Sequence, residues 1–183
     1  MKTLKKIGIT AFTALALVLT ACSGSDDDGG GGSSLSTYIN AKVDGVQFNT
    51  TTISGQPAGV ATKSGSGDLQ LIAISCSDAT ALNDPDFKAL QVVIVGQVAA
   101  GQTYQISPSS QSILSYSVNI DGSSNNDSEW DTNNCEGATG SITITALTDT
   151  KIEGTFSFTG KKENECGSQK VVTNGEFRGT FMN

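Results

Sequence analysis

Histidine is absent from this chain of 183 residues. Its absence excludes catalysis by Ser-His-Asp or Cys-His sets, and it excludes zinc sites with histidine ligands. Any enzyme activity would have to depend on carboxylates, tyrosine, lysine or hydroxyl groups. Helical periodicity is nearly absent after residue 21, which argues against a helical fold for the rest of the chain. No apolar run reaches the length of about 20 residues that a membrane-spanning helix needs.

The N-terminus carries a short export signal. Lys2, Lys5 and Lys6 form a basic start, and residues 7–19 form an apolar centre rich in alanine and leucine. A charged start, a short apolar centre and small residues at its end are typical of a secretory signal peptide. The sequence therefore predicts export.

Leu19-Thr20-Ala21-Cys22 ends this segment and resembles the lipobox of bacterial lipoproteins, L-[ST]-[AG]-C. The resemblance implies that the Cys22 thiol receives a diacylglycerol, that the peptide is cut before Cys22, and that the new amine is acylated. Several acyl chains anchor a protein stably, at about 0.8 kcal/mol per buried CH₂. We therefore expect lipidation at Cys22, with the membrane as a partner. The alternative is an ordinary signal peptide with a chance cysteine.

An acidic run, Ser25-Asp26-Asp27-Asp28, follows the cysteine. It resembles the export signal of surface-exposed lipoproteins of Bacteroidota, which implies the outer leaflet of the outer membrane. A position facing the periplasm and a plain solvated linker are the alternatives. Residues 29–34 are glycine and serine and predict a flexible tether. The predicted organisation is a signal peptide over 1–21, a lipidated cysteine with its tether over 22–35, and one domain over 36–183.

The mature chain is strongly acidic. Removal of the signal takes three lysines and leaves eight basic against 18 acidic side chains, a net charge of −10. Such a surface argues against nucleic acid as a partner and against direct binding to anionic headgroups.

The domain shows the alternation of an all-β fold. Thr and Ser alternate with Val and Ile, and turn residues recur about every 8–12 positions. This pattern predicts a single antiparallel β-sandwich or partly closed β-barrel of about nine to eleven strands. Asn174-Gly175 lies inside the last predicted strand, residues 170–182, and indicates a bulge or bend. Residues 121–134 are expected to form a long polar loop.

The clearest hairpin joins residues 141–147 to residues 151–159. One register puts every apolar side chain of this hairpin on one face. Its pairs are Ile142 with Phe156, Ile144 with Gly154, and Ala146 with Ile152.

Three cysteines remain after lipidation. Cys135 and Cys166 lie just beyond the open end of the predicted hairpin, so its register favours a disulfide between them in the oxidising envelope. This bridge would contribute about 3–4 kcal/mol in the chain-entropy model. Cys76 alternates with Ile72 and Ile74 and is expected to be a buried free thiol. A metal site of three cysteines is the alternative, although the sequence has no C-x-x-C spacing.

The polar loop concentrates oxygen ligands. Asp121, Asp127, Glu129 and Asp131 are the candidate ligands for Ca²⁺, which prefers hard oxygen donors on flexible loops. The loop does not match the EF-hand pattern. A solvated loop in an acidic protein is the alternative.

Trp130, the single tryptophan, lies between two of these carboxylates. It is either a platform for stacking a sugar or a hydrophobic plug over the base of the loop. Glycoside hydrolysis would need two carboxylates about 5–10 Å apart in a cleft. Nothing in the sequence singles out such a pair, so no catalytic residue is predicted.

Four short segments occur in a recognisable order. They are residues 41–48 (AKVDGVQF), 101–104 (GQTY), 154–158 (GTFSF) and 172–177 (VTNGEF). Together with the lipobox they resemble a family of small outer-membrane lipoproteins of Bacteroidota. The resemblance implies an all-β domain and no established activity, and it supplies no catalytic residue. The Cys135–Cys166 pair and the Trp130 loop lie outside the shared pattern.

These observations predict a non-enzymatic lipoprotein of the cell envelope that binds a ligand or partner or has a structural role, without a cofactor. Two alternatives stay open. One is a glycan-binding or glycan-processing protein that works with an outer-membrane uptake system, with Trp130 contacting the sugar. The other is an adhesion module stabilised by calcium.

Overall fold

The computed structural model describes residues 36–82, 84–119 and 128–181. Within these ranges the chain forms thirteen β-strands and one short 3₁₀ helix, η1 (Gly67–Leu69). The strands are β1 (Tyr38–Val43), β2 (Val46–Asn49), β3 (Thr52–Ile53), β4 (Gln56–Pro57), β5 (Gly59–Ser64), β6 (Leu71–Ser77), β7 (Phe87–Val95), β8 (Thr103–Ile106), β9 (Ile113–Asn119), β10 (Glu129–Asp131), β11 (Thr139–Leu147), β12 (Lys151–Lys162) and β13 (Glu165–Thr180). None of the described segments is a helix long and apolar enough to cross a membrane.

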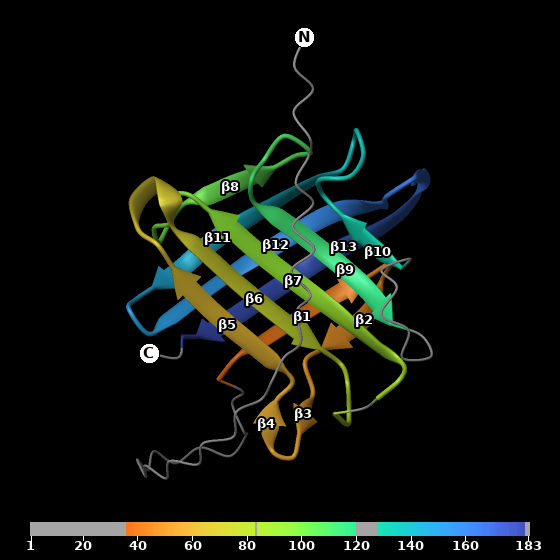
Figure 1. The fold of residues 1–183 in the computed structure, drawn as a ribbon, viewed down its shortest axis with the longest axis horizontal. Coiled ribbons are helices and arrows are strands. Elements are labelled where there is room, and N and C mark those ends of the chain that lie inside the picture. Colours follow the sequence, from red (N-terminus) through yellow and green to blue (C-terminus); the bar gives the residue numbers. More distant parts are fainter. Residues whose placement is uncertain (1–35, 83, 120–127, 182–183) are drawn as a thin grey trace. The chain divides into compact units, whose positions relative to one another are not determined.

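Eleven of these strands form one curled antiparallel sheet, and β3 and β4 form a separate small hairpin. The main sheet folds into two layers (Figure 1). One layer pairs β10, β9, β7, β6 and β5 in that order. The other pairs β8, β11, β12, β13, β1 and β2. The strands of the two layers cross at a large angle (Figure 1). The strand pairs of the main sheet are antiparallel, so the sequence prediction of an antiparallel all-β fold is confirmed.

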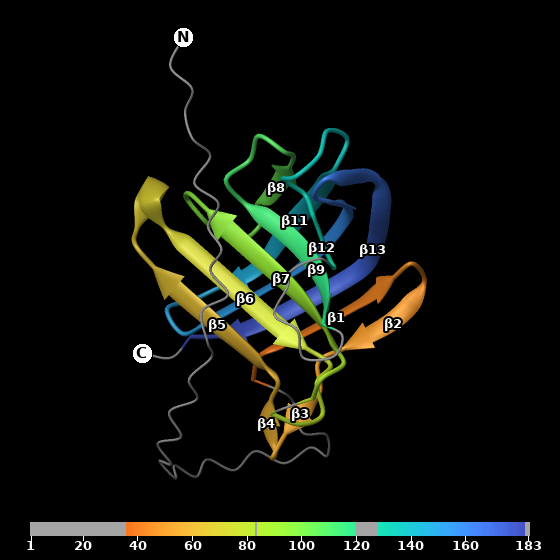
Figure 2. The same cartoon turned by 45° about the vertical axis from the view of Figure 1, so that its right-hand side comes forward.

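Strand β12 connects the layers because it is longer than its partner β11. Residues 152–159 pair with β11, and the last two residues, Lys161 and Lys162, pair with β10. At the opposite side, Ala61 of β5 forms a parallel bridge with Phe181, directly after β13. Figure 2 shows the C-terminal end of the described chain beside β5. The sheet is therefore curled into a half-barrel.

Period-2 alternation builds the interior. On β1, Ile39 and Ala41 are buried while Lys42 is exposed. The remaining strands of the main sheet all contribute side chains to the core as well. The two layers thus enclose one apolar cluster that includes Leu90, Leu114 and Phe177. No buried polar side-chain atom in the described ranges lacks a hydrogen-bond partner. The polar groups buried beside this cluster are thus satisfied within the described part of the fold.

The structure corrects the predicted hairpin register at one end. Ile142 pairs with Phe156 and Ile144 with Gly154 as expected, but Ala146 pairs with Glu153 rather than with Ile152. The register shifts between Ile144 and Ala146, because one extra residue enters β11 as a bulge.

Two further predictions were wrong in part. Glu129–Asp131 forms strand β10 inside the segment predicted as a loop, because β9 and β12 leave unpaired ladder positions there that this segment fills. The last strand also begins earlier than residue 170, at Glu165, since it extends the β12 ladder as far as Lys162.

Candidate functional site

The most distinctive polar surface lies on the outer face of the β8–β2 layer, on the side away from the core. Residues at matching register positions line up across six strands there. Each member of this first polar row pairs with the next: Thr103, Thr143, Thr155, Glu176, Asn40 and Asn49. All six side chains are polar, and only Glu176 is charged.

A second polar row lies two residues further along the strands. Gln105 pairs with Ser141, and Ser141 with Ser157. Beyond β12 the row continues through Thr173, which pairs with Lys42 of β1. Hydroxyls in these rows contact one another: the Oγ1 atoms of Thr103 and Thr143 lie 2.8 Å apart, and the Oγ atoms of Ser141 and Ser157 lie 3.4 Å apart.

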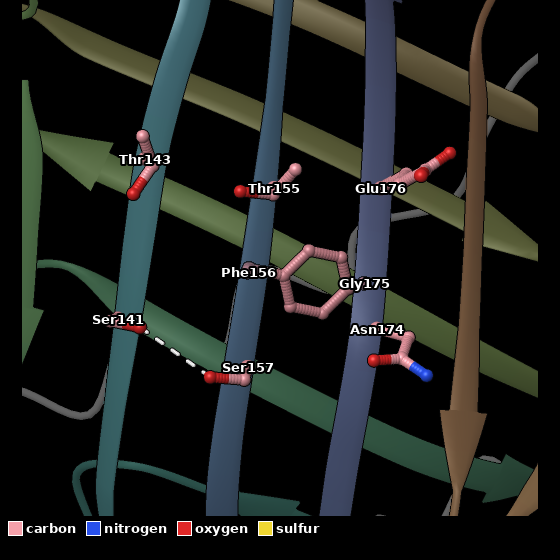
Figure 3. Close-up of a pocket in the computed structure, with 8 residues that line it drawn as sticks. All are labelled: Ser141, Thr143, Thr155, Phe156, Ser157, Asn174, Gly175 and Glu176. Carbon is pink, nitrogen blue, oxygen red and sulfur yellow. Dashed lines mark hydrogen bonds between the residues drawn. The ribbon is translucent and has the colours of Figure 1, made fainter. Parts of the chain in front are cut away.

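Between the rows the surface has two shallow depressions that are open to solvent. A hollow of about 430 Å³ is lined by Ser141, Thr143, Thr155, Phe156, Ser157, Asn174, Gly175 and Glu176 (Figure 3). A second hollow of about 330 Å³ shares Ser141 and Ser157 with the first. Its lining is completed by Gln105, Thr139, Gly140, Phe158, Thr159, Val171, Val172 and Thr173. Because they share residues, we treat the two hollows as one surface and call it the polar groove.

A bulge in β13 shapes the groove. The β12–β13 register shifts between Phe156 and Phe158, and Asn174 has a left-handed backbone with φ of 52°. The extra residue leaves both Thr173 and Asn174 exposed. The predicted bulge at Asn174-Gly175 is confirmed, and it places the Asn174 amide in the groove.

Gly175 gives the groove its floor. A Cβ atom at this position would lie 2.6 Å from the Cδ1 and Cε1 atoms of Phe156. The missing side chain lets the Phe156 ring lie between β12 and β13, against Gly175, where it is only 4% exposed (Figure 3). Any larger residue would displace this ring.

The groove is nearly uncharged. Glu176 is its one ionisable lining residue. Among the described residues, no hydrogen bond or ion pair joins the Glu176 or Asn174 side chain to another group. Both groups are therefore available to a ligand. The lining offers hydroxyls, amides and one carboxylate, which can donate and accept hydrogen bonds.

Trp130 lies away from the groove, on the inner face of β10. Its ring packs against the apolar core and lies 6.0 Å from the Tyr116 ring. Its Nε1 donates a hydrogen bond to Ser168 Oγ at 2.9 Å, and the Lys170 ammonium lies 5.4 Å from the ring. Of the two interpretations of Trp130, these contacts favour the hydrophobic plug, because the ring is engaged on several sides.

The calcium hypothesis stays a prediction. Asp121 and Asp127 lie outside the described residues. Asp131 already accepts hydrogen bonds from the backbone N–H groups of Asn133 and Asn134, each at 2.8 Å. Burial raises the pKa of both Glu129 and Asp131. In the described part of the chain, no group of three or more acidic or cysteine side chains is placed to hold a metal ion.

The cysteines follow the sequence prediction. Cys135 and Cys166 form a disulfide with Cα atoms 5.6 Å apart. Cys76 is a buried free thiol, and burial raises its pKa to about 12. Cys22 lies outside the described residues.

Sequence reasoning missed the groove although its residues alternate with the predicted core. In residues 141–147 and 151–159 the apolar residues of the alternating pattern identified the inner face. The polar residues between them were interpreted only as a solvent-exposed face. The signal was the run of small hydroxyl residues Ser141, Thr143, Thr155 and Ser157. Its meaning depends on Asn174 and Glu176, which only the fold brings beside them.

A family model described as a domain of unknown function (DUF6252) matches residues 36–180. Comparisons with curated proteins and with solved structures each found no match. The matched range begins before β1 and ends with β13, so it contains the whole curled sheet and the polar groove.

Proposed function

The chain belongs to the family of the domain of unknown function DUF6252, and from that premise we propose that it is a lipid-anchored envelope protein whose β domain binds a polar ligand without transforming it. The observation that carries this proposal is the polar groove. It presents available hydrogen-bonding groups on a β-sheet, and its lining holds a single carboxylate, Glu176, which makes no hydrogen bond to a lining hydroxyl among the described residues.

The groove supports binding better than catalysis. Glycoside hydrolysis by the common routes uses two carboxylates, whereas Glu176 is alone in the lining. The lining hydroxyls of Ser141 and Ser157 contact one another rather than a base. A ligand in the groove would thus be held by hydrogen bonds, with no group positioned to cleave it.

The anchor is the second part of the proposal. The lipobox ending in Cys22 supports attachment through lipid, and the acidic run after it supports exposure on the outer surface of the outer membrane. The strongly acidic mature chain would not adhere to anionic headgroups by itself. A lipid at the N-terminus supplies the attachment that the domain surface lacks.

The anchor is tested by metabolic labelling with an alkyne fatty acid. The wild-type protein should be labelled and found in the membrane fraction, and Cys22→Ala should lose the label and leave that fraction. Protease added to intact cells then distinguishes the two faces: digestion supports surface exposure, and resistance supports a position facing the periplasm. An unlabelled wild-type protein would refute lipidation.

Ligand binding is tested with the soluble domain on glycan and peptide arrays. Ser157→Arg fills the groove, and we expect it to weaken binding at least about tenfold, which corresponds to roughly 1.4 kcal/mol. Thr62→Arg is the matched control, since Thr62 is exposed on β5 in the other layer. Binding that survives Ser157→Arg, or no binding on either array, would contradict the proposal. Release of cleavage products would contradict its non-enzymatic part.

A further inference from the structure

The chemistry of the polar groove narrows its ligand to one class. Resting on the function proposed above, we propose that the groove binds an uncharged, unbranched glycan chain that lies across strands β8, β11, β12 and β13, one sugar over each strand.

The first argument is the kind of group that lines the groove. Hydroxyls of Thr143, Thr155 and Ser157 both donate and accept hydrogen bonds, and so does the Asn174 amide through its two ends. A sugar presents the same mixture of donors and acceptors around its ring. A peptide, in contrast, satisfies its backbone best at a strand edge, and here the lining is the face of a sheet.

The second argument is spacing. Neighbouring strands lie about 4.8 Å apart, and this distance is close to the length that one sugar adds to an extended glycan chain. The row Thr103, Thr143, Thr155 and Glu176 places one polar side chain on each of four adjacent strands. An extended chain would therefore meet an equivalent group at each successive sugar.

The third argument is twist, which sets the length of the site. Neighbouring strands rotate by roughly 20–25°, so a straight ligand follows such a row only over a few strands. The two hollows span β8 to β13 and leave out β2, although the polar row continues to Asn49 of β2. The site thus suits about four sugars, one for each strand it crosses.

The fourth argument is charge. Glu176 is exposed and has no partner among the described residues, and the whole chain carries a net charge of −7. A uronate or sulfated sugar would bring a second negative charge beside this carboxylate, which disfavours binding. Glu176 can instead accept hydrogen bonds from the hydroxyls of a neutral sugar.

The fifth argument is the absence of a stacking surface. Phe156 and Phe158 are the aromatic residues of the groove lining, and both are nearly fully buried. Binding must therefore rest on hydrogen bonds, each of which contributes little in water. A single sugar would bind too weakly to detect, and affinity would accumulate along a chain.

The test is calorimetric titration of the soluble domain with neutral β-linked gluco-, xylo- and manno-oligosaccharides of one to six sugars. At least one series should bind, with affinity that rises several-fold per added sugar up to about four and then levels off. A polyuronate oligosaccharide of the same length is the charged comparison, and we expect it to bind at least about tenfold more weakly.

Variants place the ligand. Asn174→Ala should weaken the binding of the tightest neutral oligosaccharide about five- to tenfold, as expected for a lost hydrogen bond. Thr62→Arg should leave this affinity unchanged. Glu176→Gln should reduce the discrimination against the polyuronate. Each variant is first shown to have the same melting temperature as the wild-type domain.

The outcomes separate this inference from the function on which it rests. Groove-dependent binding of a peptide or a polyuronate, or equal affinity for one sugar and four, overturns the glycan assignment and leaves a ligand-binding groove. If neither Ser157→Arg nor Asn174→Ala changes the glycan affinity, the groove is not the binding site, and the proposed function is overturned with it.

Discussion

The indole Nε1 of Trp130 donates a hydrogen bond of 2.9 Å to the Ser168 hydroxyl, two residues beyond the disulfide at Cys166. This contact joins β10, which follows the segment outside the described residues, to the beginning of β13. The disulfide joins the same two parts of the chain through Cys135. Trp130 and the bridge therefore act on the same junction, and Trp130 is a structural residue in this arrangement.

Substitution of Trp130 should reduce stability. Trp130→Ala removes the packing against Tyr116 and the core, and we expect it to lower the free energy of unfolding by about 2–4 kcal/mol. Trp130→Phe keeps most of the packing and loses the hydrogen bond, at about 1 kcal/mol. Urea denaturation followed by circular dichroism measures both. If Trp130→Ala left stability intact and abolished glycan binding, Trp130 would be a ligand platform after all.

The disulfide should contribute substantially to stability. It spans 31 residues, and the double variant Cys135→Ala and Cys166→Ala should lower the free energy of unfolding by about 3–4 kcal/mol. Mass spectrometry of a digest without reductant should find Cys135 joined to Cys166 and Cys76 free. A peptide that joins Cys76 to either partner would contradict the fold at this junction.

Alkaline pH should destabilise the domain through Cys76. Burial raises the pKa of this thiol to about 12, whereas an unfolded thiol ionises near pH 8.5. The unfolded state therefore loses its proton first, and the free energy of unfolding should fall by about 1.4 kcal/mol for each pH unit between these values. Burial also raises the pKa of Tyr116 to about 12, so this tyrosine adds to the fall above about pH 10.

Urea denaturation at pH 8 and pH 10 measures this effect, and Cys76→Ala is the control that should remove most of the difference between them. The same burial should protect Cys76 from iodoacetamide in the folded state, with full labelling in urea. Rapid labelling of the folded protein would contradict the burial of this side chain.

Gly175 should not tolerate a side chain. Gly175→Ala places a Cβ atom 2.6 Å from the Phe156 ring and should lower the free energy of unfolding by about 1–3 kcal/mol. Gly167→Ala is the matched control on the same strand, because nothing lies within 4 Å of a Cβ atom there. Thermal melting of both variants checks the comparison, and equal melting temperatures would show that the ring moves aside freely.

Local patterns predicted the parts of the fold that depend on neighbours in sequence. The pairs Ile142–Phe156 and Ile144–Gly154 of the β11–β12 hairpin follow from alternation alone. The bulge that shifts Ala146 could not be predicted this way. One inserted residue changes the pairing of two strands without leaving a distinct mark on the pattern of either.

Long-range pairing explains what the sequence did not reveal. Residues 129–131 form a strand only because β9 and β12 lie on either side of them. The groove likewise needs Ser141 and Asn174 to be neighbours, and this neighbourhood comes from the pairing of β13 with β12. Small hydroxyl residues on a strand are typical of any exposed face, so their composition alone did not mark a site.

The hydrogen bonds at the start of β1 determine how the domain responds to a mechanical pull. Thr180 at the end of β13 donates its backbone N–H to Thr37 Oγ1 at 3.2 Å and its hydroxyl to the Ser36 carbonyl at 2.7 Å. Tension transmitted along the preceding chain would pass into β1 through the backbone and into β13 through these two hydrogen bonds, and β13 carries Asn174 and Glu176. A pull on the lipid anchor that we propose at Cys22 would therefore act on β1 and β13 together, and β13 is also the strand that carries Cys166 of the disulfide.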